Sequence, residues 1–152
     1  MRIIYLASCI FTISHLTISK LTDGPALELG LTDHFISFLN ESNYEFYGFN
    51  KTEFYGGSYG GKISDEDSII NQPVVFVHGN GDLAAGRDED LQSGFKYSIQ
   101  YFLSKGYKRS ELYATTWGYG DVPHELQHYH ADVYLIYVRK FIDAVLEYTN
   151  AT

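Results

Sequence analysis

Apolar residues in the second half of the chain follow two patterns, one typical of buried strands and one typical of helices. Residues 73–79, "PVVFVHG", form a continuous apolar run that ends in glycine and predicts a buried parallel strand. Residues 111–118, "ELYATTWG", predict a second strand. Between the two strands, apolar residues at helical spacing predict a helix that stops at Gly106, and these residues are Phe95, Ile99, Phe102 and Leu103.

A second helix is expected over residues 131–149. Its apolar stripe comprises Val133, Tyr137, Phe141, Val145 and Tyr148. The order strand, helix, strand, helix predicts an α/β layer fold with a mostly parallel sheet. Upstream, residues 27–40 predict a short helix with Thr32 as its N-cap, and residues 41–70, rich in Gly, Ser, Asn and Tyr, predict loops.

The predicted sheet is too small to stand alone. Only two clear strands follow residue 70, and the last helix has no strand after it to complete its crossover. Two parallel strands with helices cannot bury both sheet faces well. We therefore expect residues 20–152 to be the N-terminal portion of a larger domain that is incomplete at its C-terminus.

The first 19 residues have the pattern of a secretory signal peptide. Arg2 supplies a positive start, residues 3–13 are an apolar run, and Thr17 and Ser19 are small residues before a cleavage point at Lys20. The alternatives are a membrane anchor or a buried helix, but the run is too short to span a bilayer and no later segment qualifies. We expect a secreted, extracellular protein without a transmembrane segment.

Composition and charge narrow the classes of partner. The net charge is −8 and Lys and Arg do not cluster, which argues against a nucleic-acid partner. Cys9 is the only cysteine and would leave with the signal peptide, so no disulfide is expected. Asn40 and Asn50 begin N-x-S/T sequons and are the expected glycosylation sites; Asn150 begins a third sequon.

Ser58 lies in a match to G-x-S-x-G between Gly56 and Gly60. In a nucleophile elbow this pattern joins a strand to a helix. Here the following residues, "GKISDED", form a polar stretch without helical periodicity, and the best strand comes after the serine. We interpret the segment as a glycine-rich loop, with Ser58 not acting as a nucleophile.

A second motif, "HELQH" over residues 124–128, matches the zincin pattern H-E-x-x-H. His124 and His128 would bind zinc and Glu125 would polarise a metal-bound water. Pro123 places His124 in a first helical turn, and no third histidine follows at metzincin spacing. A polar, histidine-bearing loop is the alternative, and we expect no metal site.

The stretch "VVFVHGNGDLAAG" allows two interpretations. Gly79, Gly81 and Ala84 loosely fit a G-x-G-x-x-A dinucleotide fingerprint, which requires a helix that begins in this loop. The better interpretation is an oxyanion loop of His78, Gly79, Asn80 and Gly81. A glycine after the strand would let the chain turn sharply, so that the Asn80 N–H faces the site as a donor to an oxyanion. His78 would hold the loop through hydrogen bonds from its ring.

At these residues the chain resembles the secreted class 2 lipases of the α/β-hydrolase superfamily, and most closely their nematode members. The segments that carry the resemblance are "QPVVFVHGNGD", "YATTWGYGD" and "VRKFIDAVLEYTNAT", and it covers roughly residues 30–152. The resemblance assigns the oxyanion donor role to Asn80. It also implies that the nucleophilic serine follows Thr152, with the acid and the histidine later still. His124, His128 and His130 precede that serine and fit the family order poorly.

The resemblance implies a carboxylic-ester hydrolase of the triacylglycerol lipase type, active in lipid degradation, with an ester or lipid substrate and no cofactor. The 152 residues themselves carry the oxyanion loop without a catalytic triad, so we expect them to be a fragment or inactive alone. A secreted zinc metalloprotease-like protein using "HELQH" and a non-enzymatic truncated paralogue are the alternatives. Acyl-chain preference and oligomeric state stay open.

Overall fold

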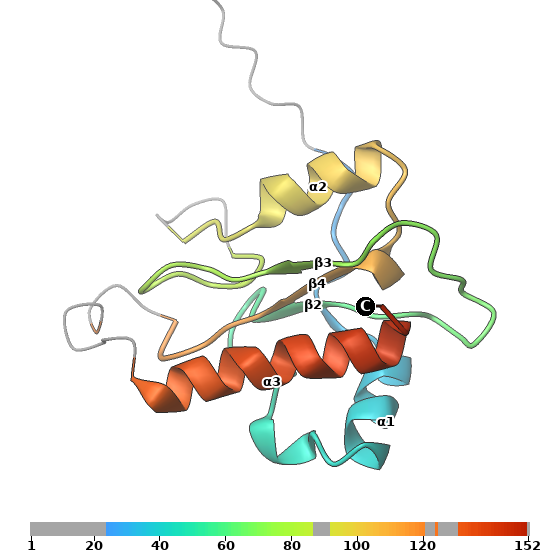
Figure 1. Cartoon of the computed structure of the whole chain (residues 1–152). Coiled ribbons are helices and arrows are strands. Elements are labelled where there is room, and N and C mark those ends of the chain that lie inside the picture. The colour runs from blue at the N-terminus through green and yellow to red at the C-terminus, as the bar shows by residue number, and fades with distance from the viewer. Residues whose placement is uncertain (1–23, 87–91, 121–123, 125–130, 152) are drawn as a thin grey trace, which may run out of the picture.

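The computed structural model describes residues 24–86, 92–120, 124 and 131–151 (Figure 1). A four-stranded sheet has the order β1-β2-β4-β3, in which β2 is antiparallel to β4 and the other two pairs are parallel. Its strands are β1 (Gly30–Leu31), β2 (Ser58–Gly60), β3 (Val74–Phe76) and β4 (Leu112–Thr115). The helices are α1 (Asp33–Glu41), α2 (Lys96–Ser104) and α3 (Asp132–Thr149), with short 3-10 turns η1 (Glu45–Tyr47) and η2 (Arg109–Glu111).

Helices cover both faces of the sheet. In Figure 1, α2 lies on one side of the strands, and α1 and α3 lie on the other. The central strand β4 shows why both faces are apolar: Leu112 and Ala114 belong to the core under α2, whereas Tyr113 belongs to the core under α1 and α3. Alternate side chains of a strand point to opposite faces, so a strand covered on both sides needs a continuous apolar run.

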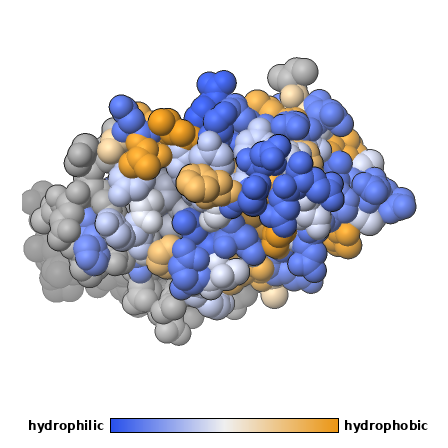
Figure 2. All heavy atoms as spheres, turned by 90° about the horizontal axis from the view of Figure 1, so that it is seen from below, coloured by the Kyte–Doolittle hydropathy of each residue, from blue (hydrophilic) through white to orange (hydrophobic). Residues whose placement is uncertain are grey.

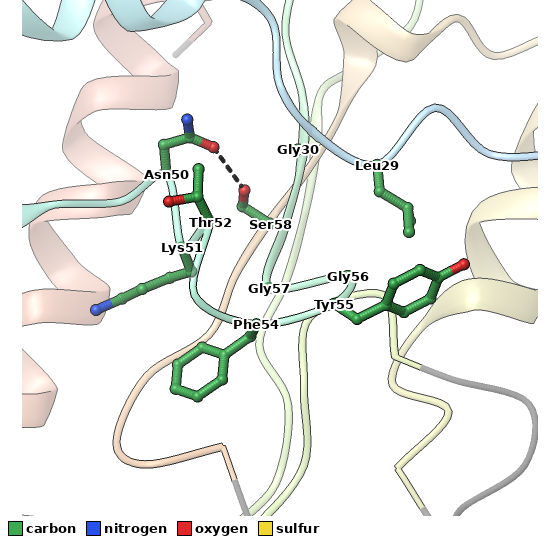
Figure 3. A pocket seen from close by; sticks show the side chains of 10 residues that line it. All are labelled: Leu29, Gly30, Asn50, Lys51, Thr52, Phe54, Tyr55, Gly56, Gly57 and Ser58. Atoms are coloured by element: carbon green, nitrogen blue, oxygen red, sulfur yellow. Dashed lines mark hydrogen bonds between the residues drawn. The ribbon is translucent and has the colours of Figure 1, made fainter.

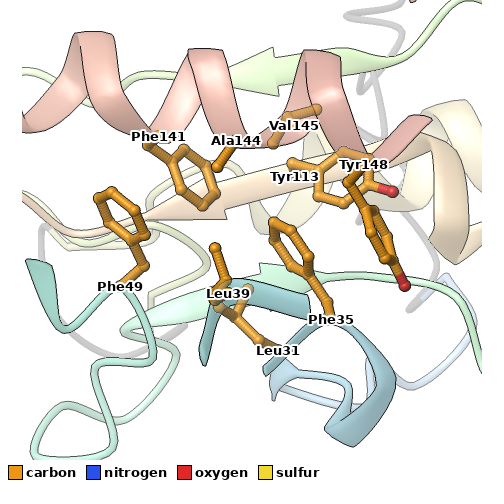
Figure 4. Close-up of a cluster of buried hydrophobic side chains, with 9 residues drawn as sticks. All are labelled: Leu31, Phe35, Leu39, Phe49, Tyr113, Phe141, Ala144, Val145 and Tyr148. Carbon is orange, nitrogen blue, oxygen red and sulfur yellow. The ribbon is translucent and has the colours of Figure 1, made fainter. Parts of the chain in front are cut away.

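Phe35 of α1 lies at the centre of the core shared with α3 (Figure 4). Its ring lies 4.5 Å from that of Tyr148, 5.3 Å from that of Tyr113 and 6.4 Å from that of Phe141, measured between centroids. Offset and edge-on aromatic pairs of this kind add to the stabilisation that comes from area burial alone. The contacts fix α1 and α3 against the sheet.

Thr32 is the N-cap of α1 as expected, but the helix begins at Asp33 and not at residue 27, because Gly30 and Leu31 form β1. Its hydroxyl accepts a hydrogen bond from the backbone N–H of Phe35 at 3.2 Å. This bond satisfies one of the donors that the first helical turn leaves without a partner.

Helix α3 confirms most of the expected apolar stripe. Phe141, Val145 and Tyr148 are buried, whereas Val133 is 65% exposed. Val133 lies in the first turn of α3, where the stripe extends beyond the core.

Glu111 anchors the segment that leads into β3. Its buried carboxylate accepts hydrogen bonds from the backbone N–H groups of Ile70, Asn71 and Lys108 and from the Asn71 side chain, at 2.6 to 3.0 Å. These donors lower the pKa of Glu111, although burial alone would raise it. Glu111, which begins the predicted strand 111–118, therefore holds the segment that leads into β3.

Two expectations change in detail. The predicted loop over residues 41–70 contains η1 and the buried strand β2. A three-residue strand with two glycines around it lacks the alternation that predicts strands. Strand β3 is also less buried than its apolar sequence suggests. Val74 and Val75 are only half-buried, because β3 is an outer strand of the sheet.

On the face that α1 and α3 cover, hydrophobic and hydrophilic residues do not separate into large patches (Figure 2). Hydrophobic side chains lie among hydrophilic ones there (Figure 2). Within the described residues, no helix is both long and apolar enough to cross a membrane.

Candidate active site

The candidate oxyanion loop lies at the carboxyl end of the sheet. His78 is the second residue after β3, and Trp117 is the second residue after β4. Because β3 and β4 are parallel, both residues lie beyond the same end of the sheet, the carboxyl end of these strands. Ligand sites of α/β sheets form at this end, where loops from neighbouring strands meet.

The ring of His78 makes one hydrogen bond to each of these two loops. Nε2 accepts a hydrogen bond from the backbone N–H of Trp117 at 2.9 Å, and Nδ1 lies 2.6 Å from the carbonyl oxygen of Gly79. In return, the Trp117 indole N–H donates to the carbonyl oxygen of His78 at 2.9 Å. The two rings are stacked with centroids 5.4 Å apart. The pair therefore connects the loop after β3 to the loop after β4.

The hydrogen bonds determine the tautomer of His78. Nε2 accepts from an N–H group, so it carries no proton, and Nδ1–H must be the donor to Gly79. His78 is 3% exposed, and burial lowers its pKa despite the opposing effect of the Gly79 carbonyl. The neutral imidazole is thus the form that fits this site.

The bond to Gly79 also determines where the Asn80 N–H points. The Gly79 carbonyl and the Asn80 N–H belong to one peptide unit, and the described chain contains no cis peptide bond. In a planar trans peptide these two groups point in opposite directions. Since the carbonyl points to the His78 ring, the Asn80 N–H points away from it.

The turn in this loop occurs two residues later than expected. Gly81 has a φ of +72°, in the left-handed region that favours glycine, whereas Gly79 does not. A Cβ atom at Gly79 would meet nothing within 4 Å. The backbone freedom that we expected at Gly79 is therefore used at Gly81.

The same loop excludes the dinucleotide interpretation. The fingerprint requires a helix that begins within the loop, but residues 79–86 are not helical, and the next described helix, α2, begins at Lys96. Ala84 instead donates its N–H to the Thr116 hydroxyl at 3.0 Å, which adds another link between the two loops.

Ser58 does not form a nucleophile elbow. It begins β2, is 1% exposed, and donates from Oγ to the Asn50 side-chain oxygen at 3.1 Å. An amide oxygen cannot act as the base that a serine nucleophile needs.

The glycines of this motif have packing roles. Gly56 has a φ of +69° and Gly60 a φ of +119°. A Cβ atom would lie 2.8 Å from the Gly86 nitrogen at the first position and 2.2 Å from the Leu112 carbonyl oxygen at the second. Close backbone packing therefore explains why glycines flank Ser58. The G-x-S-x-G match needs no nucleophilic role for this serine.

A pocket of about 460 Å³ lies beside Ser58 (Figure 3). Asn50, Thr52 and Ser58 lie on one side of it, and Leu29 and Tyr55 lie on the other. No residue of the loop 77–86 lines this pocket. The segments 29–30 and 50–58 line it instead.

The two expected glycosylation sites differ in exposure. Asn40, at the end of α1, is exposed, whereas Asn50 is half-buried. The Asn50 side-chain oxygen also accepts a second hydrogen bond, from the N–H of Leu31 at 3.4 Å. Asn40 is thus the more accessible acceptor in the folded chain.

The zincin motif falls largely outside the described residues, which include His124 but not Glu125 or His128. The His124 ring lies 5.2 Å from that of Tyr119. Within the described part of the chain, no group of three or more His, Cys, Asp or Glu side chains could hold a metal ion.

A string of Asp65, His34 and Tyr148, missed in the sequence, has the order of a catalytic triad. His34 Nε2 lies 3.2 Å from an Asp65 oxygen, and Nδ1 lies 2.6 Å from the Tyr148 hydroxyl. Burial raises the Tyr148 pKa to about 12, so this hydroxyl is a poor nucleophile near neutral pH. The string connects α1 to α3.

This string is also remote from the candidate loop. Tyr134, whose ring lies 5.4 Å from that of Trp117, is 14 residues before Tyr148 on α3. At about 1.5 Å per residue, the two tyrosines are roughly 21 Å apart along the helix axis.

Comparison with known proteins identifies the family. The family described as Lipase (class 2) matches residues 71–152, a little over half of the chain. The chain belongs to the class 2 lipase family. The match includes β3, β4, α3 and the His78 loop. No curated protein and no solved structure matches the chain.

Proposed function

We propose that this protein is a secreted carboxylic-ester hydrolase of the triacylglycerol lipase type that acts in lipid catabolism. Membership of the class 2 lipase family supports ester hydrolysis and a lipid or ester substrate. The observation that carries the proposal is the orientation of the Asn80 N–H, which the His78–Gly79 hydrogen bond directs away from the buried ring. A backbone N–H held in one direction is what oxyanion stabilisation requires.

The proposed reaction is acyl transfer through a serine nucleophile. The serine oxygen attacks the acyl carbonyl while a histidine takes its proton, and the carbonyl oxygen becomes an oxyanion that the Asn80 N–H helps to stabilise. As this intermediate collapses, the ester C–O bond breaks and the histidine gives the proton to the leaving alcohol; water then hydrolyses the acyl-enzyme. Ser58 is buried against Asn50, so the nucleophile is a different serine.

We propose that the whole domain has the fold of the α/β-hydrolase superfamily. A mixed sheet with helices on both faces and functional loops at the carboxyl ends of β3 and β4 supports it. Within the described residues β3 is one of the two outer strands, and another parallel strand beside it would extend the sheet. The resemblance to nematode members in the segments around His78 and Trp117 supports a place among them.

The deciding experiment removes the Asn80 N–H from the protein made from its complete native transcript. Asn80→Pro lacks this donor, whereas Asn80→Ala keeps it and removes only the side chain. We expect Asn80→Pro to lower kcat for p-nitrophenyl butyrate by about 10²- to 10³-fold, as for other oxyanion donors. Asn80→Ala should lose far less, and Ser58→Ala should retain turnover.

Circular dichroism and the unfolding midpoint of each variant should first establish that it folds. Equal losses in Asn80→Pro and Asn80→Ala would contradict the donor role of the backbone. A stable wild-type protein with no turnover of short-chain esters or of triacylglycerol would contradict the hydrolase proposal and favour a non-enzymatic paralogue.

A further inference from the structure

Gln92 connects the two loops that form the candidate active site. Its side-chain Nε2 donates to the carbonyl oxygen of Gly81 at 2.9 Å and to that of Gly120 at 2.8 Å. Gly81 directly follows Asn80 in the loop after β3, whereas Gly120 lies in the loop after β4. One amide group carries two N–H donors, so a single Gln92 side chain can hold both carbonyls.

The backbone around Gln92 is itself closely packed on the first loop. The N–H of Gly94 donates to the Asp82 carboxylate at 3.1 Å. A Cβ atom at Gly86 would lie 1.8 Å from the Gln92 carbonyl oxygen, and one at Gly94 would lie 2.3 Å from the Leu83 carbonyl oxygen. The segment 92–94 therefore packs directly against the first loop, and the Gln92 side chain extends from it to the second loop.

We propose that Gln92 is a positioning residue for the reaction, because it holds the backbone beside Asn80 at a set distance from the loop after β4. This inference rests on the proposed ester hydrolysis. His78 and Trp117 join the two loops where they leave the sheet, and Gln92 joins them again at Gly81 and Gly120. Asn80 lies between these two attachments, so the peptide that carries its N–H is held at both ends.

The physical consequence concerns the transition state more than substrate binding. A donor must lie about 2.7–3.1 Å from the developing oxyanion, and a misplacement of about 1 Å can lower a rate by about 10²-fold. Loss of Gln92 should therefore lower kcat while leaving KM nearly unchanged, which is the signature of an interaction made in the transition state.

Gln100 supplies a matched control. It is a buried glutamine on α2 whose Nε2 donates to a single backbone carbonyl, that of Pro25, at 3.2 Å. Gln100→Leu removes a buried side-chain donor without touching either loop. Gln92→Leu removes the donors to both loops, and Gln92→Asn keeps the amide on a shorter side chain.

The test measures kcat and KM for p-nitrophenyl butyrate in these variants of the protein from its complete transcript, together with unfolding midpoints. We expect Gln92→Leu to lower kcat by about 10- to 100-fold with KM within about twofold, and Gln92→Asn to recover part of the loss. Gln100→Leu should keep wild-type kcat. In hydrogen exchange, peptides covering 78–86 and 116–120 should both exchange faster in Gln92→Leu, and neither should in Gln100→Leu.

The outcomes separate this inference from the proposed function. If the wild type hydrolyses the ester and Gln92→Leu keeps its kcat, or loses no more than Gln100→Leu, the positioning role is wrong and the hydrolase proposal stands. A rise in KM with unchanged kcat would also overturn it, because Gln92 would then act on substrate binding. If the wild type hydrolyses no ester, both proposals fail together.

Discussion

His78 is the residue on which the geometry of the candidate site depends most. One ring nitrogen accepts from Trp117 and the other donates to Gly79, and this division of roles exists only in the neutral imidazole. Protonation would give Nε2 a hydrogen that faces another N–H group. The residue that orients the Asn80 peptide is therefore also sensitive to acid.

The stability of the protein should fall in acid through His78. Burial lowers its pKa in the folded state, so its contribution is fully present above the unfolded value of about 6.5 and is lost as pH falls through the folded pKa. Urea unfolding between pH 8 and pH 5 checks this, with the emission of Trp117, the single tryptophan of the chain, as the probe.

His78→Gln is the control for this prediction, because glutamine cannot titrate in this range. We expect its stability to be lower than that of the wild type at pH 8 and to change less between pH 8 and pH 5. An equal slope in the two proteins would mean that other groups cause the acid sensitivity.

Sequence reasoning found one half of this arrangement. The position of His78 at the end of an apolar strand indicated a loop-holding residue, and the structure places its ring on Gly79. Trp117 was visible only as the end of a strand, and Gln92 had no signal at all. Trp117 lies 39 residues from His78, and Gln92 lies 11 and 28 residues from the two glycines whose carbonyls it binds. Hydrogen bonds between residues so far apart in the sequence leave no local pattern.

At the scale of elements, the contact between α1 and α3 stabilises one face of the sheet. Phe35 contributes most directly, because its buried ring contacts residues of β4 and α3. Phe46, at η1, is of the same residue type but is 90% exposed. Substitutions at Phe35 and Phe46 can therefore be compared directly, because the two positions differ mainly in how far the ring is buried.

Phe35→Ala should lower the free energy of unfolding by about 3–5 kcal/mol, the usual range for a buried phenylalanine that leaves a cavity. Phe46→Ala should change it by less than about 0.5 kcal/mol, as at most exposed positions. Chemical denaturation of both variants measures the difference. Similar losses in the two would mean that the core formed by α1 and α3 contributes little to stability.

Element prediction succeeded where the pattern was long and failed where it was short. The eighteen residues of α3 carry enough turns to show their apolar stripe, and β3 lies within the uninterrupted apolar run of residues 73–77. Strand β2 has three residues, with Gly60 at its end, and is held in the sheet by pairing with β1 and β4. Nothing in its own sequence distinguishes it from a loop.

At the scale of the whole molecule, we propose export and glycosylation. The segment 1–19 lies outside the described residues, so this proposal stays with its sequence pattern. Expression in a eukaryotic secretory host should give a mature protein in the medium that begins at Lys20. Edman sequencing of the secreted protein checks the cleavage point, and retention of the complete chain in cells would contradict export.

The same secreted protein tests the two expected glycosylation sites, Asn40 and Asn50. Asn40 is exposed and Asn50 is half-buried with its side-chain oxygen in use, so we expect fuller occupancy at Asn40. Asn40→Gln should remove one glycan mass, measured against enzymatic deglycosylation by mass spectrometry. Equal occupancy at both asparagines would mean that glycans are added before the Asn50 contacts form.

The sequence by itself determined which segments become the main strands and helices, and where the loop after β3 lies. These features follow from local periodicity, capping and glycine placement, which act between residues close in the chain. Only the tertiary structure decided the mixed pairing of β2, the bond between His78 and Trp117, and the two carbonyls held by Gln92. Each of these joins segments far apart in sequence, so it exists only after the chain has folded and brought them together.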